Sequence, residues 1–347
     1  MKSRSVALDD IAQRAGVSTA TVSRALNEQT SSLVSTEARE RIQGLAREMN
    51  YRVHSGARGL RRQRTEVIAL INRAPHRQVS DPFLSEFTGE VCEALEQHGY
   101  DVLLAHRAQH GGDWIDRLVR GRRVDGLVIT HRATRDPDLD ELTEMGVPFA
   151  VLGRPFDGQH YVSTGSDNDH GGYLAGRHLI ELGQRRIAVI TGPLSKTESN
   201  ERFHGFVRAL QDAAVPLPPE CVVQTDYQLP LVQEGMARLL AMRPAITAVF
   251  VASDMMAIAA LEVIQRQGWR VPDDISVVGF DDIPLAAYTS PSLTTVRQDI
   301  RRIGHLLAEQ VVARIEGRTV ESATLPVELV LRSSTAAPAS TRGDAPK

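Results

Sequence analysis

The side chains that could perform acid–base or nucleophilic chemistry do not form a familiar catalytic arrangement. Asp281 and Asp282 are adjacent carboxylates, but neighbouring residues of a strand point to opposite faces and make a poor acid–base pair. The histidines form no HExxH motif, and the chain has no Gly-x-Ser-x-Gly elbow and no Walker phosphate-binding loop. We therefore expect a protein that is not an enzyme, with no catalytic residues, no resident metal and no cofactor.

The uneven distribution of charge indicates binding chemistry instead. Residues 1–64 carry twelve lysines and arginines against six acidic residues, a net charge of +6, whereas the remaining 283 residues carry −9. A basic segment on an acidic chain is typical of a protein that binds a polyanion such as nucleic acid. A solvated basic surface without a partner is the alternative that charge alone leaves open.

Three short helices are predicted within the basic segment. Apolar residues at 8, 11, 12 and 15 have the spacing of one helix, and Gly16 is suited to end it. Ser18 is a favourable N-cap for a second helix over 19–26, and a third helix is predicted to begin near Ser35. Two helices joined by a turn of about three residues are typical of the helix-turn-helix.

The residues of this turn and of the second helix make the prediction more specific. They resemble the DNA-binding head of the LacI/GalR family of bacterial transcriptional regulators in the string Ala12-x-x-Ala15-Gly16-Val17-Ser18-x-x-Thr21-Val22-Ser23-Arg24-x-Leu26-Asn27. The resemblance implies that the second helix enters the major groove of DNA. Base edges would be read by Thr19, Ala20 and Arg24, and Arg24 is suited to a bidentate contact with guanine.

Other polar residues of the same string would hold the phosphate backbone, which positions a protein on DNA without reading sequence. The resemblance implies this role for Ser18, Thr21, Ser23 and Asn27. The alternative for Thr21 and Ser23 is that they cap the helix or simply lie on its surface.

A basic arm, residues 51–64, follows the three helices. It matches the hinge helix of the family at Ala57, Arg58 and Leu60, and the resemblance implies that Arg58 and Leu60 contact DNA. Leu60 would be wedged into the minor groove, where it would kink the duplex. Gly56 and Gly59 are poor helix formers, so we expect the arm to be disordered without DNA. A flexible basic linker is the alternative.

From about residue 65 short apolar runs alternate with helical stretches, a pattern that predicts parallel sheets. Strands are expected at 67–71, 102–105, 126–130, 149–152, 187–191, 222–224, 248–252 and 276–280. Two such units predict a two-lobed domain over 65–335 with a cleft between the lobes. Later strands at 294–298 and 325–331 are expected to return to the first lobe, and residues 336–347 to form a disordered tail.

The resemblance to the LacI/GalR family extends over nearly the whole chain. It includes the strings Ser253-Asp254-x-x-Ala257 and Ile275-Ser276-Val277-Val278-Gly279-Phe280-Asp281-Asp282. The expected fold class is α/β: an N-terminal helix-turn-helix head (residues 1–50) and a periplasmic-binding-protein-like body of two doubly wound parallel sheets. Such a body implies a small-molecule effector, a sugar or sugar derivative, in the cleft.

The resemblance also implies which residues bind the effector: Phe83, Arg202, Tyr227, Ser253, Asp254 and Asp281. Arg202 and Asp281 would hydrogen-bond ligand hydroxyls, while Tyr227 would pack on the ligand and Phe83 would approach from the other lobe. For Asp254 we favour a structural helix N-cap over ligand contact. A surface position is the alternative for Tyr227.

The expected protein is a homodimeric, cytoplasmic transcriptional regulator, with repression as the expected mode, that binds near-palindromic double-stranded operator DNA. Two distant cysteines, Cys92 and Cys221, fit a reducing compartment. No apolar run approaches the ~20 residues that span a bilayer, so no membrane partner is expected. The alternative function is a sugar-binding or sugar-processing protein with an incidental basic head.

Overall fold

A computed structural model describes residues 6–26, 30–51, 64–72, 81–106, 114–130, 136–155, 158–242 and 245–338. The chain divides into two compact units, Met1–Thr65 and Glu66–Lys347, called here the head and the body. Asn27, Arg58 and Leu60 lie outside the described residues, as do most of the arm and residues 339–347. Their expected roles therefore stay predictions.

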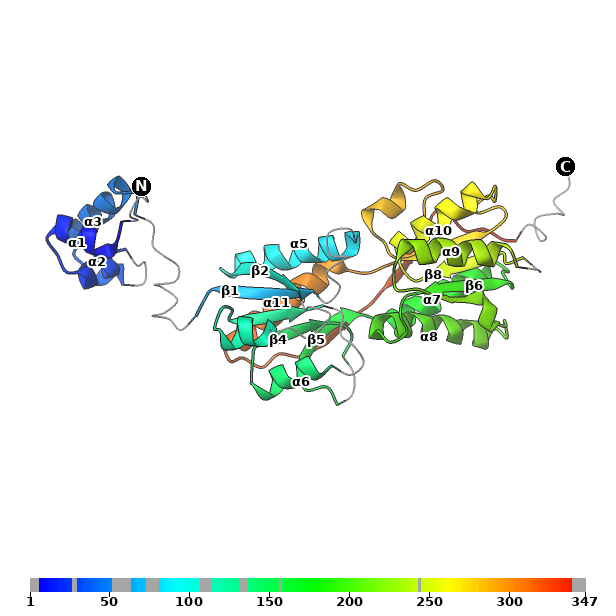
Figure 1. The fold of residues 1–347 in the computed structure, drawn as a ribbon, viewed down its shortest axis with the longest axis horizontal. Helices are drawn as coiled ribbons and strands as arrows, with labels where there is room; N and C mark the ends of the chain where they lie inside the picture. Colours follow the sequence, from blue (N-terminus) through cyan, green and yellow to red (C-terminus); the bar gives the residue numbers. More distant parts are fainter. Residues whose placement is uncertain are drawn as a thin grey trace. The chain divides into compact units, whose positions relative to one another are not determined.

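The head is a bundle of three α-helices, as the sequence predicts. Its elements are α1 (Leu8–Ala15), α2 (Thr19–Ala25), the short 3-10 helix η1 (Ser31–Leu33) and α3 (Thr36–Glu48) (Figure 1). Gly16 ends α1 with a left-handed φ of 66°, and Ser18 caps α2 by accepting a hydrogen bond from the Thr21 N–H. Ile11, Val22 and Ile42 are fully buried where the three helices meet. This small core fixes the orientation of α2.

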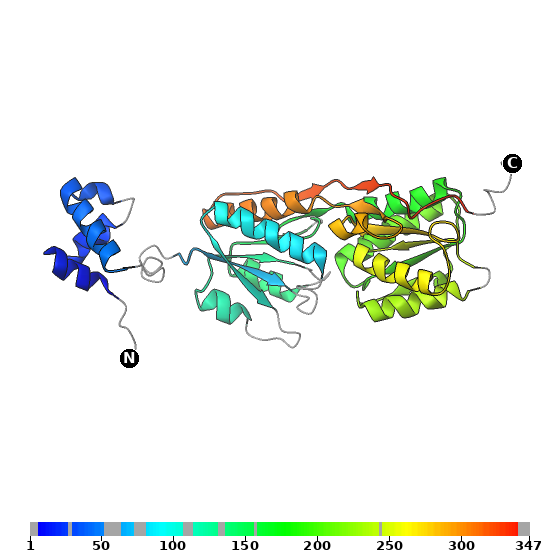
Figure 2. The same cartoon turned by 90° about the horizontal axis from the view of Figure 1, so that it is seen from above.

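The first lobe of the body is built on a parallel sheet in the order β11-β5-β4-β3-β1-β2. Its strands are β1 (Val67–Asn72), β2 (Asp101–His106), β3 (Gly126–Ile129), β4 (Phe149–Leu152), β5 (Val162–Ser166) and β11 (Ala323–Leu325). Its helices are α5 (Pro82–Gln97), the π-helix η2 (Asp116–Arg120), α6 (Pro137–Glu144) and α11 (Ile300–Ile315). Alternate residues of β1 face opposite layers: Ile68 and Leu70 pack with α5 and α11, whereas Ala69 and Ile71 pack with α6. Figure 2 shows α5 and α11 side by side.

The second lobe repeats this plan around the order β12-β10-β9-β8-β6-β7, with only β12 antiparallel among the described strands. Its strands are β6 (Ile187–Thr191), β7 (Val222–Gln224), β8 (Ala248–Val251), β9 (Ser276–Asp281), β10 (Thr294–Arg297) and β12 (Glu328–Val330). Its α-helices are α7 (Asn168–Glu181), α8 (Thr197–Asp212), α9 (Leu229–Leu240) and α10 (Asp254–Arg266), with short 3-10 helices η3 (Pro219–Cys221) and η4 (Pro284–Ala287). The pair α7 and α8 and the pair α9 and α10 cover opposite faces (Figure 1).

The expected destination of the late strands was wrong. Segment 294–298 does not return to the first lobe: it forms β10, which pairs in parallel with β9 of the second sheet. The single strand expected over 325–331 is split at Pro326, which lacks the N–H that a ladder requires, into β11 of the first sheet and β12 of the second. What returns to the first lobe is α11 followed by β11.

Two further differences concern polar segments. Strand β5 was not predicted, because Ser163, Thr164 and Ser166 interrupt its apolar pattern although all three are buried. The expected disordered tail begins with a residue that is held in place: the Ala336 N–H donates to Ser276 Oγ at 3.0 Å and its carbonyl accepts from Gln184 Nε2 at 2.8 Å. No helix among the described residues is long and apolar enough to cross a bilayer.

Candidate functional sites

A cavity in the body, lined by residues of both lobes, collects most of the residues that were expected to bind an effector. Its empty space, including the part open to solvent, is about 660 Å³. The expected residues that line it are Phe83, Arg202, Tyr227, Ser253 and Asp281. Several of its residues end or follow parallel strands, as expected for a crevice at the carboxyl ends of an open α/β sheet. We call this space the effector cavity.

Close packing of two helices positions the central arginine of the effector cavity. A Cβ added at Gly172 of α7 would lie 1.9 Å from the carbonyl oxygen of Arg202 on α8, so the two backbones are in direct contact there. The same close approach occurs at Gly205 of α8, where an added Cβ would lie 1.7 Å from the carbonyl oxygen of Asp169. These glycines bring Arg202 beside the first turn of α7.

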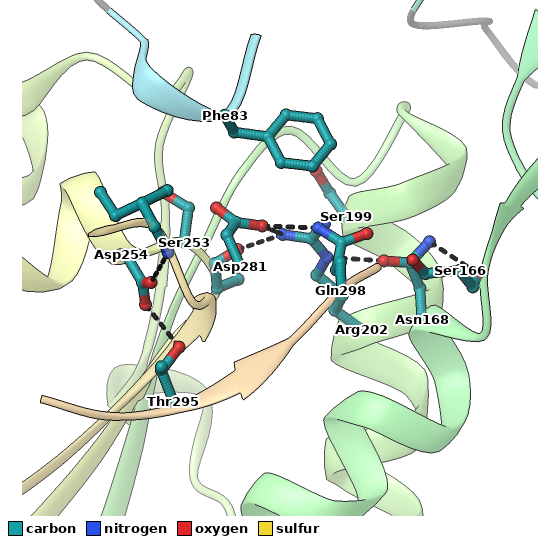
Figure 3. Close-up of polar contacts among 12 residues, drawn as sticks. Phe83, Ser166, Asn168, Ser199, Arg202, Ser253, Asp254, Asp281, Thr295 and Gln298 are labelled. Carbon is teal, nitrogen blue, oxygen red and sulfur yellow. Dashed lines mark hydrogen bonds and ion pairs between the residues drawn. The ribbon is translucent and has the colours of Figure 1, made fainter. Parts of the chain in front are cut away.

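The guanidinium of Arg202 is buried and held by acceptors from three elements. Its Nε donates to Asn168 Oδ1 at 2.8 Å, and its Nη1 donates to the Ala252 carbonyl at 2.7 Å and to Asp281 Oδ1 at 3.2 Å (Figure 3). Its Cζ lies 3.8 Å from the centre of the Phe280 ring, a favourable cation–π geometry. Since Nε and Nη1 bind protein acceptors, Nη2 is the nitrogen that we expect to donate to a ligand.

The two adjacent carboxylates at the end of β9 serve different partners. Asp281 Oδ1 also accepts from Gln298 Nε2 at 2.8 Å and faces the effector cavity. Asp282 instead forms ion pairs with Arg297 at 2.6 Å and Arg332 at 2.5 Å. Both residues have left-handed φ values, 121° and 57°, which separate the side chains.

The structure gives Ser253 and Asp254 different roles, and the role of Asp254 is not the expected one. Ser253 lines the effector cavity and caps α10, whereas Asp254 is the first helical residue and does not line the cavity. Asp254 is fully buried, and its carboxylate accepts hydrogen bonds from Thr295 Oγ1 at 2.5 Å and from the Ile283 N–H at 3.0 Å. Burial and the nearby Asp281 carboxylate raise the pKa of Asp254 well above its ordinary value. Asp254 is therefore neither the N-cap nor a lining residue; it lies beneath the site.

The first lobe contributes an aromatic ring and a half-exposed cation. Phe83 is in the first turn of α5, and its N–H donates to Asp81 Oδ1 at 3.1 Å. Arg154, which follows β4, lies 3.3 Å from Asp167, and both side chains are more than a third exposed. This side of the effector cavity is less tightly fixed than the side around Arg202.

Tyr227 is not an ordinary surface residue. Its Oη lies 2.5 Å from Ser199 Oγ, and its ring lies against Gly192, where an added Cβ would be 2.4 Å away. Its φ of 56° is left-handed, a conformation that side chains rarely adopt. The ring is thus held at the cavity wall by specific contacts.

Several lining residues were missed: Asp81, Arg154, Ser166, Asn168, Glu198, Glu201 and Gln298. The rule that ligands bind beyond the carboxyl ends of strands could have found Ser166 and Gln298, had β5 and β10 been placed correctly. Asn168, the first residue of α7, carried no signal of its own in the sequence. Glu198 and Glu201 lie on α8, several residues beyond the end of β6, so no strand end marked them in the sequence.

The head presents α2 as the expected DNA-reading surface. Thr19, Ala20 and Arg24 are exposed, as base readers must be. Ser18 Oγ and Thr21 Oγ1 lie 2.9 Å apart and Ser18 also caps the helix, so both hydroxyls take part in capping. Capping is compatible with a phosphate contact, because one hydroxyl can donate and accept at once.

Known proteins are similar to this chain in both its head and its body. The family model described as "Bacterial regulatory proteins, lacI family" matches residues 7–53, and that described as "Periplasmic binding protein-like domain" matches residues 177–335. The regulator CelR of Thermobifida fusca is 35% identical over 94% of this chain and 95% of its own. The ribose operon repressor of Haemophilus influenzae is 34% identical, and the repressor PurR of Aliivibrio salmonicida 32% identical, each over 94% of this chain and 98% of its own.

Two solved structures show the same similarity in three dimensions. The lac repressor dimer bound to operator and the anti-inducer ONPF has a TM-score of 0.84 and 28% identity, covering 96% of this chain and 100% of its own. The complex of CelR with cellobiose has a TM-score of 0.73 and 32% identity, covering 95% and 99%.

Proposed function

The chain belongs to the LacI family of bacterial regulatory proteins, and on this basis we propose that it is a transcriptional repressor whose DNA binding is controlled by a sugar or sugar derivative in the effector cavity. The observation that carries the proposal is the buried set formed by Arg202, Asn168 and Asp281 at that cavity. Its relatives are named as regulators, not as enzymes.

The head acts on DNA as one half of a dimer. A two-fold dimer presents two copies of α2 to a near-palindromic operator, because the symmetry of the protein matches the symmetry of the site. The lac repressor structure with operator is such a dimer. Since its target is chromosomal DNA, we place the protein in the cytoplasm.

A polyhydroxylated effector fits the cavity because donors and acceptors alternate around it. Arg202 and Gln298 supply N–H donors, whereas the carboxylates of Asp281 and Glu201 supply acceptors, and a sugar hydroxyl can satisfy both kinds. The Phe83 and Tyr227 rings supply flat apolar surface of the kind that sugar-ring C–H groups contact. The relative solved with cellobiose supports the same chemical class.

Control of DNA binding follows if the ligand binds one arrangement of the lobes better than another. The ligand then shifts the equilibrium between these arrangements by no more than its difference in affinity for them. A coupling of about 1–3 kcal/mol changes the affinity for the operator about 5- to 150-fold. The lobe arrangement would reach DNA through residues 51–64.

A gel-shift assay with the DNA upstream of the protein's own gene tests this function, together with a thermal-shift screen of sugars, polyols and nucleobases. We expect a salt-sensitive, sequence-specific complex, and one sugar that raises the melting temperature and changes the complex. Arg24→Ala should weaken specific binding by about 1–3 kcal/mol and leave binding to random DNA nearly intact. A protein that binds a sugar but no specific DNA would support the alternative, a sugar-binding protein with an incidental basic head.

A further inference from the structure

A second cluster of ligating side chains lies in the first lobe, on the face where α5 packs against α11. Glu90 and Glu93 are on α5, and His305 is on α11. One ligand atom from each of the three side chains lies within 4.8 Å of the other two. His305 is distant in sequence from the two glutamates, so no short spacing motif predicts the cluster. Neither the proposed regulatory function nor the effector cavity uses this cluster.

The helices are brought together here by a glycine. A Cβ added at Gly304 would lie 2.8 Å from the Cβ of Glu90 and 3.3 Å from the backbone nitrogen of Val91. Any larger residue at 304 would separate the two helices. Gly304 therefore places its neighbour His305 directly over Glu90.

The geometry of Glu90 and His305 is not that of an ordinary hydrogen-bonded pair. His305 Nε2 lies 3.4 Å from Glu90 Oε2, and each side chain is only 21% exposed. Both atoms are buried, yet neither makes a hydrogen bond, although the distance would allow one. Buried polar atoms without a partner are uncommon and call for an explanation. A carboxylate oxygen and an imidazole nitrogen that lie this close without a hydrogen bond between them can both bind a third atom.

We propose that Glu90, Glu93 and His305 bind a divalent transition-metal ion, with Zn²⁺ as the best match. Zinc bonds to imidazole nitrogen and carboxylate oxygen are about 2.0–2.2 Å long, so two ligands of a tetrahedral ion lie roughly 3.3–3.5 Å apart. The Glu90–His305 distance has this value. One imidazole and two carboxylates suit zinc better than calcium or magnesium, which prefer oxygen alone. The fourth position would be taken by water.

The charged groups around the cluster are of both signs. Glu86 lies one turn before Glu90, and its pKa is raised by burial and by the nearby carboxylates of Glu90 and Asp282. Arg301 Nε lies 3.8 Å from Glu90 Oε2 and would compete with a metal. Its side chain is 71% exposed, so it can turn into solvent when a metal binds.

The test uses full-length protein without an affinity tag, stripped of metal with a chelator and then titrated with Zn²⁺ against a chromophoric competitor. We expect one Zn²⁺ per chain and a rise in melting temperature of roughly 5 °C at saturation. Co²⁺ in place of Zn²⁺ should give the visible absorption of a low-coordinate site. Loss of one ligand should lower the affinity by at least about 100-fold, since even residues that only support ligands are worth about 10- to 100-fold.

Three variants and one control assign the site. His305→Asn and Glu90→Gln should abolish both the cobalt spectrum and the thermal shift, and the exposed Glu93→Gln should weaken both without unfolding the protein. The control is His98→Asn, a change at an exposed histidine at the end of α5. This variant should bind metal as the wild type does. Absence of Zn²⁺ binding in the wild type would leave an ordinary Glu–His ion pair and overturn the proposal. Unchanged metal binding in folded His305→Asn and Glu93→Gln would place the metal elsewhere and overturn it as well.

Discussion

Arg202 and Asp281, on the second-lobe side of the effector cavity, are held by buried hydrogen bonds, whereas Arg154 on the first-lobe side remains partly in solvent. The side chains of Arg202 and Asp281 are 6% and 8% exposed, but that of Arg154 is 39% exposed. A buried set is fixed before the ligand arrives, and a ligand hydroxyl can use it without further ordering of the protein. Half-exposed groups can change position at little cost. From this difference we expect Arg202 and Asp281 to fix the position of an effector and Arg154 to adjust to it.

Arg202→Ala should have the largest effect of the changes considered. It would leave the Asp281 carboxylate buried without its charge partner, so we expect a loss of about 3–5 kcal/mol in unfolding free energy and no effector response. Urea unfolding and effector-dependent thermal shift measure the two effects. Arg208→Ala, on the same helix but 45% exposed, is the matched control and should change both only slightly.

A second variant keeps this test decisive if Arg202→Ala does not fold. Arg202→Met combined with Asp281→Asn removes both charges at once and should recover much of the stability, because no unpaired ion remains. It should still fail to respond to the effector. A normal response from either variant would contradict the assignment of recognition to the second lobe.

Asp254→Asn should give the next largest effect and should show it in the pH dependence of stability. Because the folded protein holds this proton more tightly than the unfolded chain, Asp254 stabilises the fold fully below its ordinary pKa of about 3.9, and that contribution is lost as pH rises through the raised value. The variant lacks this loss, so its unfolding free energy should fall less between pH 4 and pH 8 than that of the wild type. Each unit by which folding raises the pKa adds about 1.4 kcal/mol to the unfolding free energy that is lost over this pH range.

The control for Asp254 is Asp273→Asn, a change at an exposed carboxylate paired with Arg270, which should change the unfolding free energy by no more than about 1 kcal/mol. Equal slopes for wild type and Asp254→Asn would mean that the hydrogen bonds from Thr295 and Ile283 offset burial and keep Asp254 ionised.

Phe83→Ala should have an intermediate effect, confined to effector binding. The ring is partly buried. Its loss should weaken effector binding by about 1–2 kcal/mol, roughly tenfold in affinity, with little change in unfolding free energy. Isothermal titration calorimetry of the effector identified by the screen measures this. A loss of stability as large as that of Arg202→Ala would show that the first-lobe side is as rigid as the second.

Arg154→Ala should have the smallest effect. Its ion pair with Asp167 is half exposed, and such pairs contribute about 0–1 kcal/mol to stability. Effector affinity should change by less than about tenfold. A complete loss of effector binding would instead identify Arg154 as a direct ligand contact and would argue for an anionic effector.

Local sequence patterns predicted where helices and strands occur, but they predicted less well which strands pair with one another. The helices of the head and most strands of the body follow from apolar spacing and from N-caps such as Ser18 and Ser35. The sheet to which β10 belongs could not be read in this way, because strand pairing depends on residues distant in sequence. Strand β5 was missed for a related reason: Ser163, Thr164 and Ser166 are buried, and Thr164 donates a hydrogen bond to Gln310 of the distant helix α11, which the local sequence does not reveal.

The site was predictable where the family resemblance marked it, as for Arg202, Ser253 and Asp281. Asp254 was misjudged because Ser253, one residue earlier, takes the N-cap, and because Gly279 leaves the space that the Asp254 carboxylate fills: a Cβ there would lie 2.3 Å from Oδ1. Asn168 and Gln298 were missed because their roles depend on helix and strand neighbours rather than on their own positions.

The return of α11 and β11 to the first lobe determines the order in which the body can form on the ribosome. Ile303, Leu307 and Val311 of α11 cover the apolar face that β1 and β3 present on the side of α5. Chains emerge N-terminus first and fold as units become complete. The first lobe is translated first, but its core stays uncovered until about residue 315 has left the exit tunnel. A nascent chain stalled before α11 would therefore expose this apolar surface and be a substrate for chaperones, although most of the second lobe would already be available to fold.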